Sequence, residues 1–99
     1  MTITRKKNGS TLEIAVKGKL DTTTAPDLAA EVDKGLDGAE FLLWDFSNLK
    51  YISSAGIRVL MIAANLPDDP DKMKITGCNQ MVQMAFILTG LGEWLQDAF

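Results

Sequence analysis

Two adjacent serines, Ser53 and Ser54, lie between a short apolar run and a helical pattern. The run Phe41-Leu42-Leu43-Trp44 ends at a polar residue, which is typical of a strand buried on both faces of a sheet. After the serines, one helix face is marked by apolar residues at helical spacing, namely Ile57, Leu60, Met61 and Ala64. The first turn of a helix has unpaired N–H groups and a positive dipole end, so a serine there can cap the helix and an anion is stabilised. The pair can therefore cap the helix, carry a phosphate, or do both.

The sequence contains no histidine, which excludes much catalytic chemistry. Neither a Ser-His-Asp nor a Cys-His nucleophile can be assembled, and a zinc site built on imidazole is excluded as well. The chain also lacks a P-loop and a paired-acid motif. Asp45, at the end of the apolar run, has no second acid close by in the sequence, so we expect a structural or partner-facing role for it. We predict a protein that is not an enzyme and has no metal and no cofactor.

Composition narrows the possible partners and compartments. The 99 residues suit a single domain, 1–99, and the net charge of -3 argues against nucleic-acid binding, which needs a basic face. No apolar run approaches the roughly 20 residues that span a bilayer, and the charged N-terminus is not followed by the apolar stretch of a signal peptide. The single cysteine, Cys78, cannot form an internal disulfide, and we expect it to be a small buried residue. We therefore expect a cytoplasmic protein, a monomer or weak dimer, with no membrane insertion.

The elements around the serines alternate between strand and helix patterns. We expect strands over residues 2–6, 12–17, 41–45 and 72–76, with a hairpin turn at Asn8-Gly9. We expect one helix from Thr24 as N-cap to Gly35 or Gly38, a second from the serines to about residue 66, and a third from Asn79 to Gly90. Residues 91–99 form either a final edge strand or a docked turn. This order predicts an α/β domain with a mixed sheet of four or five strands and three or more helices packed mainly on one face.

Three segments together resemble the motifs of a known family. Residues 18–25, Gly-Lys-Leu-Asp-Thr-Thr-Thr-Ala, match the pattern G-x-L-D-x-x-T-A. Residues 42–49 match an apolar strand followed by D-x-S-x-L, and residues 51–57 are similar to D-S-S/T-G-L preceded by two apolar positions. In this order and at this spacing, the segments resemble a STAS domain of the bacterial anti-sigma-factor antagonist type over nearly the whole chain.

The resemblance implies a role in partner-switching signal transduction that regulates transcription. Such an antagonist binds a GHKL-type serine kinase that is also an anti-sigma factor, and phosphorylation of one serine breaks the complex until a PPM-type phosphatase restores it. Aligned on Gly56, the phosphorylated serine falls on Ser54. Ser53 takes the place of the family's aspartate and is a second, less favoured acceptor, while Ala55 replaces a Ser or Thr.

The resemblance also implies a partner-binding surface around Ser54. It comprises Asp21, Thr22, Thr24, Ser53, Ser54, Ala55, Gly56 and Arg58. Simpler structural roles stand beside these assignments: Asp21 can be a turn residue, Thr24 is first a helix cap, and Arg58 can be a solvated charge. The alternative function is a constitutive STAS docking subunit of a lipid-transport ATPase or of a signalling scaffold.

Overall fold

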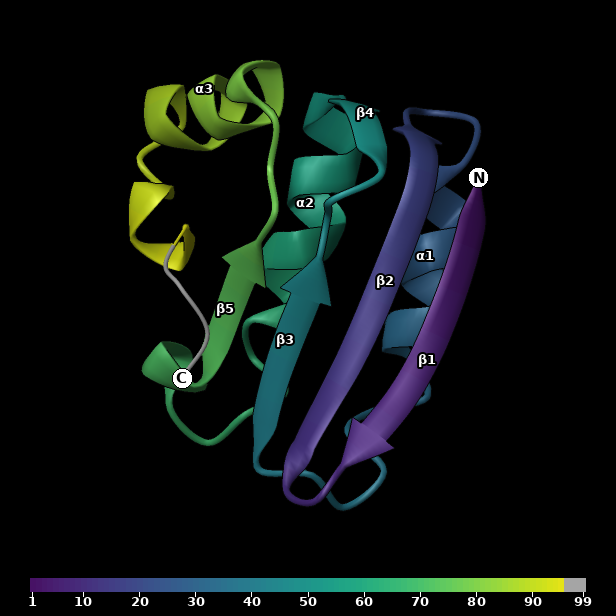
Figure 1. The fold of residues 1–99 in the computed structure, drawn as a ribbon, viewed down its shortest axis with the longest axis vertical. Helices are drawn as coiled ribbons and strands as arrows, with labels where there is room; N and C mark the ends of the chain where they lie inside the picture. Colours follow the sequence, from purple (N-terminus) through teal and green to yellow (C-terminus); the bar gives the residue numbers. More distant parts are fainter. Residues whose placement is uncertain (96–99) are drawn as a thin grey trace.

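The computed structural model describes residues 1–95, and its centre is a five-stranded mixed sheet. The strands are β1 (Thr2–Asn8), β2 (Thr11–Leu20), β3 (Phe41–Asp45), β4 (Leu49–Ile52) and β5 (Met73–Thr76). Their order is β1-β2-β3-β5, and β4 pairs with the C-terminal end of β2, residues 18–20 (Figure 1). Among these five strands, β1 alone runs antiparallel to its neighbour. The predicted α/β class and mixed sheet are confirmed.

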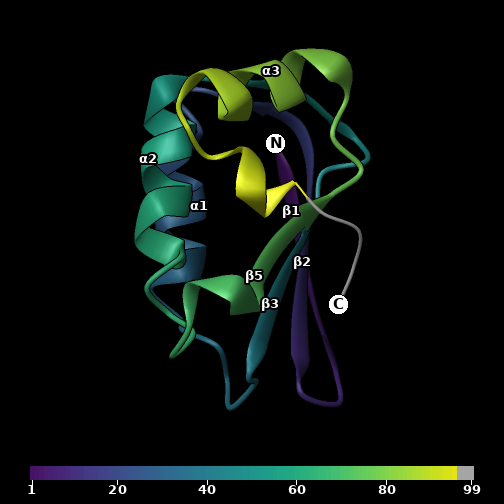
Figure 2. The same ribbon diagram turned by 90° about the vertical axis from the view of Figure 1, so that its left-hand side faces the viewer.

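Three helices accompany the sheet: α1 (Ala25–Val32), α2 (Ser54–Ala63) and α3 (Gln80–Leu88). Helices α1 and α2 lie side by side on one face, whereas α3 crosses the end of the sheet beside β4 (Figures 1 and 2). Helix α1 ends earlier than expected because Gly35, Asp37 and Gly38 adopt positive φ angles and turn the chain. Within residues 1–95, none of the helices is long and apolar enough to cross a membrane.

Two glycines help β2 to pair with β1 and with β4, in addition to its pairing with β3. Gly9, with φ of 59°, opens the two-residue loop between Asn8 and Thr11, the position that glycine takes in a type II′ hairpin turn. The turn therefore lies one residue later than expected. Gly18, with φ of 105°, lies where the register of β2 shifts, and β2 continues beyond this point to pair with β4. The sequence did not predict β4, because its central residues are both exposed and it shows no alternation.

The core lies between the sheet and its helices. Leu12, Ile14 and Val16 of β2 are buried as their alternation predicted, and Trp44 of β3 is buried too. Leu42 and Trp44 on one face of β3 are buried, whereas Phe41, Leu43 and Asp45 on the other face are only half-buried. The prediction of a strand buried on both faces was therefore wrong. The physical reason is that α1 and α2 cover a single face of the sheet (Figure 2).

One predicted core position lies on the surface instead. Met61 is 50% exposed, because α2 turns Val59 and Ala63 rather than Met61 toward its neighbours. Leu88 of α3 is exposed as well. Trp94 is buried, and its ring packs edge-on against Phe86 at 6.0 Å between centroids.

The C-terminal segment forms a docked turn as far as it is described. A 3-10 turn spans Gly92–Trp94, and Leu95 forms an isolated parallel bridge with Ile75 of β5. The predicted alternatives for residues 96–99 lie outside the described residues.

Candidate functional site

The two serines at the start of α2 have different environments. Ser53 continues the pairing of β4 with β2, because its amide donates a hydrogen bond of 2.8 Å to the carbonyl of Leu20. The residue is half-buried and is the N-cap of α2, and its Oγ accepts a hydrogen bond of 3.4 Å from the amide of Gly56. Ser54 is the first residue of α2; it is exposed, and its hydroxyl forms no hydrogen bond with the described residues. The structure thus assigns the capping role to Ser53 and leaves the Ser54 hydroxyl accessible.

Gly56 allows the start of α2 to approach the end of β2 closely. The residue is buried, and a Cβ at this position would lie 2.5 Å from Cγ of Leu20 and 3.1 Å from Cγ1 of Ile52. Any larger side chain would push α2 away from the sheet. The role of Gly56 in the described structure is therefore packing that fixes the position of the two serines.

The loop after β2 is held by a compact set of hydrogen bonds. The carboxylate of Asp21 accepts hydrogen bonds from the amides of Thr23 at 2.9 Å and Thr24 at 3.1 Å. The hydroxyl of Thr24 accepts from the amide of Asp21 and donates to the carbonyl of Lys19, both at 2.9 Å. Thr24 is the N-cap of α1 as predicted, but its side chain stabilises the loop and does not cap the helix.

These contacts affect the acidity of Asp21. The hydrogen bond from the Thr24 amide, helped by that from Thr23, holds the pKa of Asp21 below its usual value, although partial desolvation acts in the opposite direction. The nearby positive charge of Lys19 also lowers this pKa. Asp21 is therefore a carboxylate at neutral pH, and it has a structural role in the turn as well as a position on the surface.

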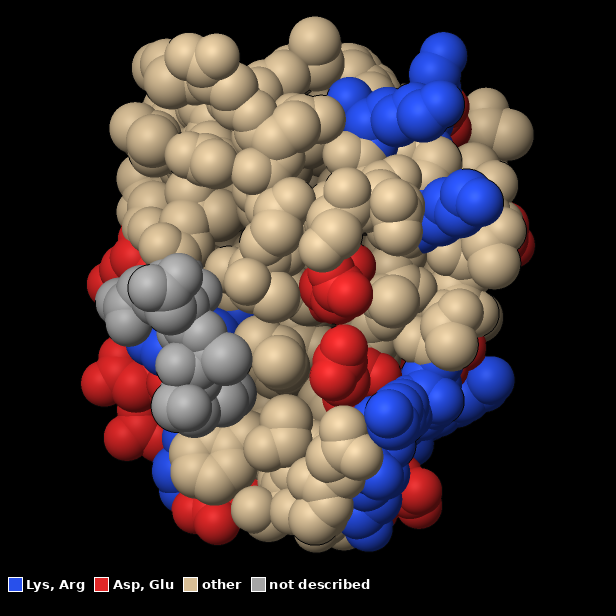
Figure 3. All heavy atoms as spheres, viewed as in Figure 1, with Lys and Arg blue, Asp and Glu red and all other residues tan. Residues whose placement is uncertain are grey.

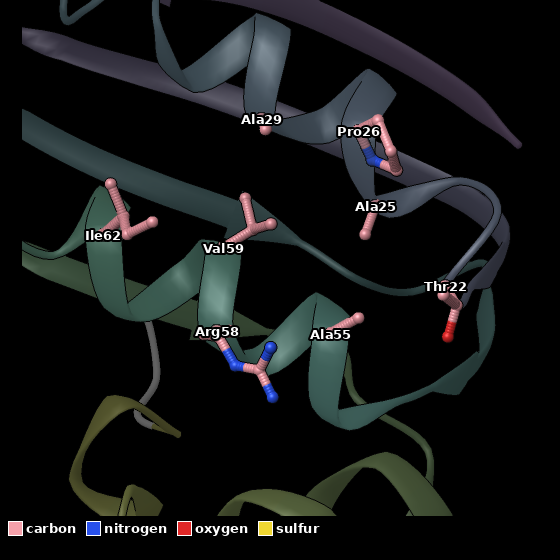
Figure 4. Close-up of a pocket in the computed structure, with 8 residues that line it drawn as sticks. All are labelled: Thr22, Ala25, Pro26, Ala29, Ala55, Arg58, Val59 and Ile62. Atoms are coloured by element: carbon pink, nitrogen blue, oxygen red, sulfur yellow. The ribbon is translucent and has the colours of Figure 1, made fainter.

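Four of the eight predicted site residues, Asp21, Thr22, Ala55 and Arg58, line one of two depressions. One is the α1–α2 groove, lined by Thr22, Ala25, Pro26, Ala29, Ala55, Arg58, Val59 and Ile62 (Figure 4). The other, which we call the β4 hollow, is lined by Lys19, Asp21, Lys50, Tyr51 and Met81. Along the chain, Ser53 and Ser54 lie between Tyr51 of the hollow and Ala55 of the groove. The site therefore brings together residues from the first and third sequence motifs, while Thr24, Ser53, Ser54 and Gly56 line neither depression.

Arg58 is the cation that lies nearest to Ser54 on α2. It follows Ser54 by four residues, so the two side chains lie on the same side of the helix. Arg58 is exposed, and its guanidinium forms no hydrogen bond or ion pair with the residues that the structure describes. Figure 4 shows the side chain extending along α2 toward Ala55, beside the groove.

Sequence reasoning missed an apolar surface on α3. Met81, Met84, Ile87 and Leu88 are between 45% and 78% exposed, and Tyr51 of β4 is exposed at 41%. Figure 3 shows no charged side chain over α3, whereas Lys and Arg gather over β1 and β2. One sequence signal could have indicated this surface, because no charged residue occurs between Lys74 and Glu93. Helix α3 contains more apolar residues than one packed face can bury.

Asn79 positions α3 next to the β4 hollow. Its Oδ1 accepts a hydrogen bond of 2.8 Å from the amide of Val82 and caps the helix, as predicted. Its Nδ2 donates to the carbonyls of Leu49 at 3.1 Å and Lys50 at 3.3 Å. One side chain therefore fixes both the start of α3 and its attachment to β4.

The remaining candidates for chemistry have structural roles in the described part of the chain. Asp45 accepts hydrogen bonds from the amide and hydroxyl of Ser47 at the end of β3. Cys78 is half-buried, not buried as expected, and this partial burial raises the pKa of its thiol to about 11, which disfavours the reactive thiolate at neutral pH. Within residues 1–95, no three His, Cys, Asp or Glu side chains are grouped to hold a metal ion.

The architecture and site define a single mixed-sheet α/β domain with an exposed serine at the start of a helix beside two surface depressions. The chain belongs to the STAS domain family, since residues 3–97 match the family model described as "Mlab, STAS domain". The match confirms that the sequence motifs resemble those of a STAS domain. Among curated proteins, no sequence match was found.

Solved structures of anti-sigma factor antagonists share the fold. An antagonist from Mycobacterium paratuberculosis is 20% identical with a TM-score of 0.84, covering 95% of this chain and 81% of that one. SpoIIAA in its unphosphorylated form is 16% identical with a TM-score of 0.72, covering 99% of this chain and 90% of that one. The Bacillus cell fate determinant SpoIIAA in its phosphorylated form is 18% identical with a TM-score of 0.74, with coverages of 99% and 92%.

Proposed function

We propose that this STAS domain is an anti-sigma-factor antagonist switched by phosphorylation of Ser54. The observation that carries the proposal is the contrast between the serines: Ser54 is exposed at the first position of α2 and its hydroxyl hydrogen-bonds to none of residues 1–95, whereas Ser53 caps the helix. The unphosphorylated domain binds a GHKL-type serine kinase that is also an anti-sigma factor. A PPM-type phosphatase removes the phosphate, so the domain is a substrate of enzymes and is not itself an enzyme. It acts in the cytoplasm as a monomer or weak dimer.

The physical basis of the switch is that the STAS domain tolerates a negative charge at Ser54, whereas the surface of the kinase packed against it does not. A phosphoryl group adds about -1.5 to -2 charges at neutral pH. At the start of α2, the helix dipole and free N–H groups favour that charge, so the host domain keeps its fold. A partner surface packed over Ser54 has to desolvate the phosphate or meet it with like charge. A loss of about 3 kcal/mol would weaken binding more than a hundredfold.

The partner-binding surface is proposed to extend from Ser54 to both depressions. Ser53, Ala55 and Gly56 shape the start of α2, and Asp21, Thr22, Thr24 and Arg58 surround it or hold its neighbouring loop. Asp21 supplies a carboxylate near the surface, so a basic residue of the kinase is its expected partner. Buried Gly56 contributes by the position it gives to the serines.

Phosphorylation of the purified domain tests the proposal. Each GHKL-type kinase encoded with it is incubated with the wild type, Ser54→Ala and Ser53→Ala in the presence of ATP. Intact-mass and peptide-level mass spectrometry should find one phosphoryl group on Ser54 in the wild type and in Ser53→Ala. Equal modification of Ser54→Ala would refute the assignment of the acceptor, and no modification by any kinase would refute the function.

A second candidate function is constitutive docking without a switch, as a subunit of a lipid-transport ATPase or of a signalling scaffold. The observation that favours it is the matching family model, which is described as the Mlab STAS domain. Under this function, Ser54→Asp would retain partner in a pull-down as well as the wild type does. Under the switch, the same substitution would release the partner.

A further inference from the structure

The α1–α2 groove has an apolar lining that offers room to a side chain from another molecule. Six of its eight lining residues are apolar, and three of these are alanines: Ala25 and Ala29 on α1 and Ala55 on α2. Because these side chains are small, the facing helices leave a depression between them (Figure 4). Ile62 borders the groove and is 59% exposed, so apolar surface remains available to a partner there.

The charge around the groove indicates which chemical group a partner would present there. Among the residues that the structure describes, Arg58 is the one charged residue that lines the groove, and no acid lines it. Since Arg58 has no ion pair within residues 1–95, its guanidinium is available to a group outside the domain. A guanidinium matches a carboxylate with two parallel hydrogen bonds, which makes a carboxylate the complementary group.

We propose that the α1–α2 groove binds an aliphatic side chain of a partner protein that lies next to an Asp or Glu, whose carboxylate pairs with Arg58. The proposal deepens the proposed function and rests on it only for the identity of the partner, the GHKL-type kinase. A membrane surface fits less well, because the domain carries a net charge of -3 and one cation at the groove, whereas binding to anionic lipids needs a cluster of basic residues. A protein segment needs only one carboxylate beside one aliphatic group.

The position of the groove links it to the phosphorylated serine. Because Ser54 precedes Arg58 by one helical turn, a phosphate on Ser54 gives the guanidinium a partner within the same helix. Phosphorylation would then act twice: it adds an anion beside the groove and occupies the cation that the partner's carboxylate uses. Both effects weaken binding of an acidic segment.

A displayed library of random dodecapeptides, panned on the unphosphorylated wild type, tests the proposal without requiring the kinase. Enriched peptides should share an aliphatic residue next to Asp or Glu. For the best peptide, Arg58→Gln and Ile62→Ser should each raise the Kd about fivefold, and changing its acid to the amide should have the same effect. Met84→Ser on α3, an exposed apolar residue outside the groove, is the matched control and should change the Kd less than twofold. Thermal melts of all variants confirm that each is folded.

Several results would overturn the proposal. These are failure to enrich any peptide, peptides without an acid, and equal binding of the acid and amide peptides to the wild type. Loss of vesicle binding in Ile62→Ser, with vesicles of phosphatidylglycerol and phosphatidylcholine, would assign the groove to a membrane. Loss of dimerisation in the same variant would assign it to a second copy of the chain.

The kinase separates failure of this proposal from failure of the proposed function. If a kinase phosphorylates Ser54 but binds Arg58→Gln as tightly as the wild type, only the groove proposal fails. If no kinase phosphorylates Ser54 while acidic peptides bind in an Arg58-dependent way, only the proposed function fails.

Discussion

Replacing Gly56 with alanine tests whether close packing at the start of α2 positions the site. The added Cβ would lie 2.5 and 2.9 Å from Cγ and Cδ2 of Leu20, which is 0% exposed and cannot move into solvent. Forcing one methyl group into such a core costs about 1–3 kcal/mol, and the better helix propensity of alanine returns at most about 1 kcal/mol. Because a separation of 2.5 Å requires Leu20 to shift, the cost falls in the upper part of that range, and we expect the free energy of unfolding to fall by about 1–2 kcal/mol. The melting temperature should fall by about 5–15 °C.

Urea denaturation and a thermal melt followed by circular dichroism measure this effect. Gly92→Ala is the matched control, because a Cβ there lies at an ordinary distance of 3.5 Å from Ile87 and should change stability by less than about 0.5 kcal/mol. Leu20→Ala removes the obstructing side chain, so the double variant should lose at least about 1 kcal/mol less than the sum of the single losses. A Gly56→Ala variant as stable as the wild type would refute the packing argument, and so would strict additivity.

Three further predictions concern the caps, the acid and the thiol. Asn79→Ala should reduce the free energy of unfolding, measured in urea, by about 1–2 kcal/mol, and Ser53→Ala should reduce it by about 0.5–1 kcal/mol. The reason is that the Asn79 side chain makes three hydrogen bonds, whereas the Ser53 side chain accepts one long hydrogen bond. Equal losses in the two variants would contradict this. Because the pKa of Asp21 is lowered on folding, its contribution to stability is present above the unfolded pKa near 3.8 and is lost as the pH falls through the lower folded value. The wild type should therefore melt at a higher temperature than Asp21→Asn at pH 6, and this difference should shrink as the pH falls to about 2.5. A difference that stays constant over this range would show that the Asp21 carboxylate does not stabilise the fold. Since burial raises the pKa of Cys78 from 9.0 to about 11, iodoacetamide at pH 8 should alkylate it about a hundredfold more slowly than an exposed thiol; a comparable rate would show that the thiol is accessible.

The elements with regular patterns could be predicted from the sequence. The alternation of Leu12, Ile14 and Val16 gave the central strand, and the family motifs identified the two chain segments that meet at the site. The structure brings these segments together because Leu20 of β2 pairs with Ile52 of β4. Strand β4 itself was missed, since its stability comes from pairing with β2 and not from a local pattern.

The different roles of the two serines and the surface features depend on tertiary contacts. In the sequence, Ser53 and Ser54 are equivalent candidates for the cap, and they differ only once the Ser53 amide binds the carbonyl of Leu20. Met61 fits the helical period as well as Val59 does, but the neighbouring α1 determines which of them is buried. The groove beside Arg58 arises from small residues on two helices that are distant in sequence, so no single motif could reveal it.

The affinity of the domain for its kinase, measured before and after stoichiometric phosphorylation, tests the central claim most directly. Isothermal titration with purified kinase and a nonhydrolysable nucleotide gives the Kd of each form, and phosphatase treatment of the phosphorylated sample provides the reversal. The account predicts that one phosphoryl group on Ser54 raises the Kd at least about a hundredfold, equivalent to about 3 kcal/mol, and that the phosphatase restores binding. An unchanged Kd for the domain phosphorylated on Ser54 would contradict the switch.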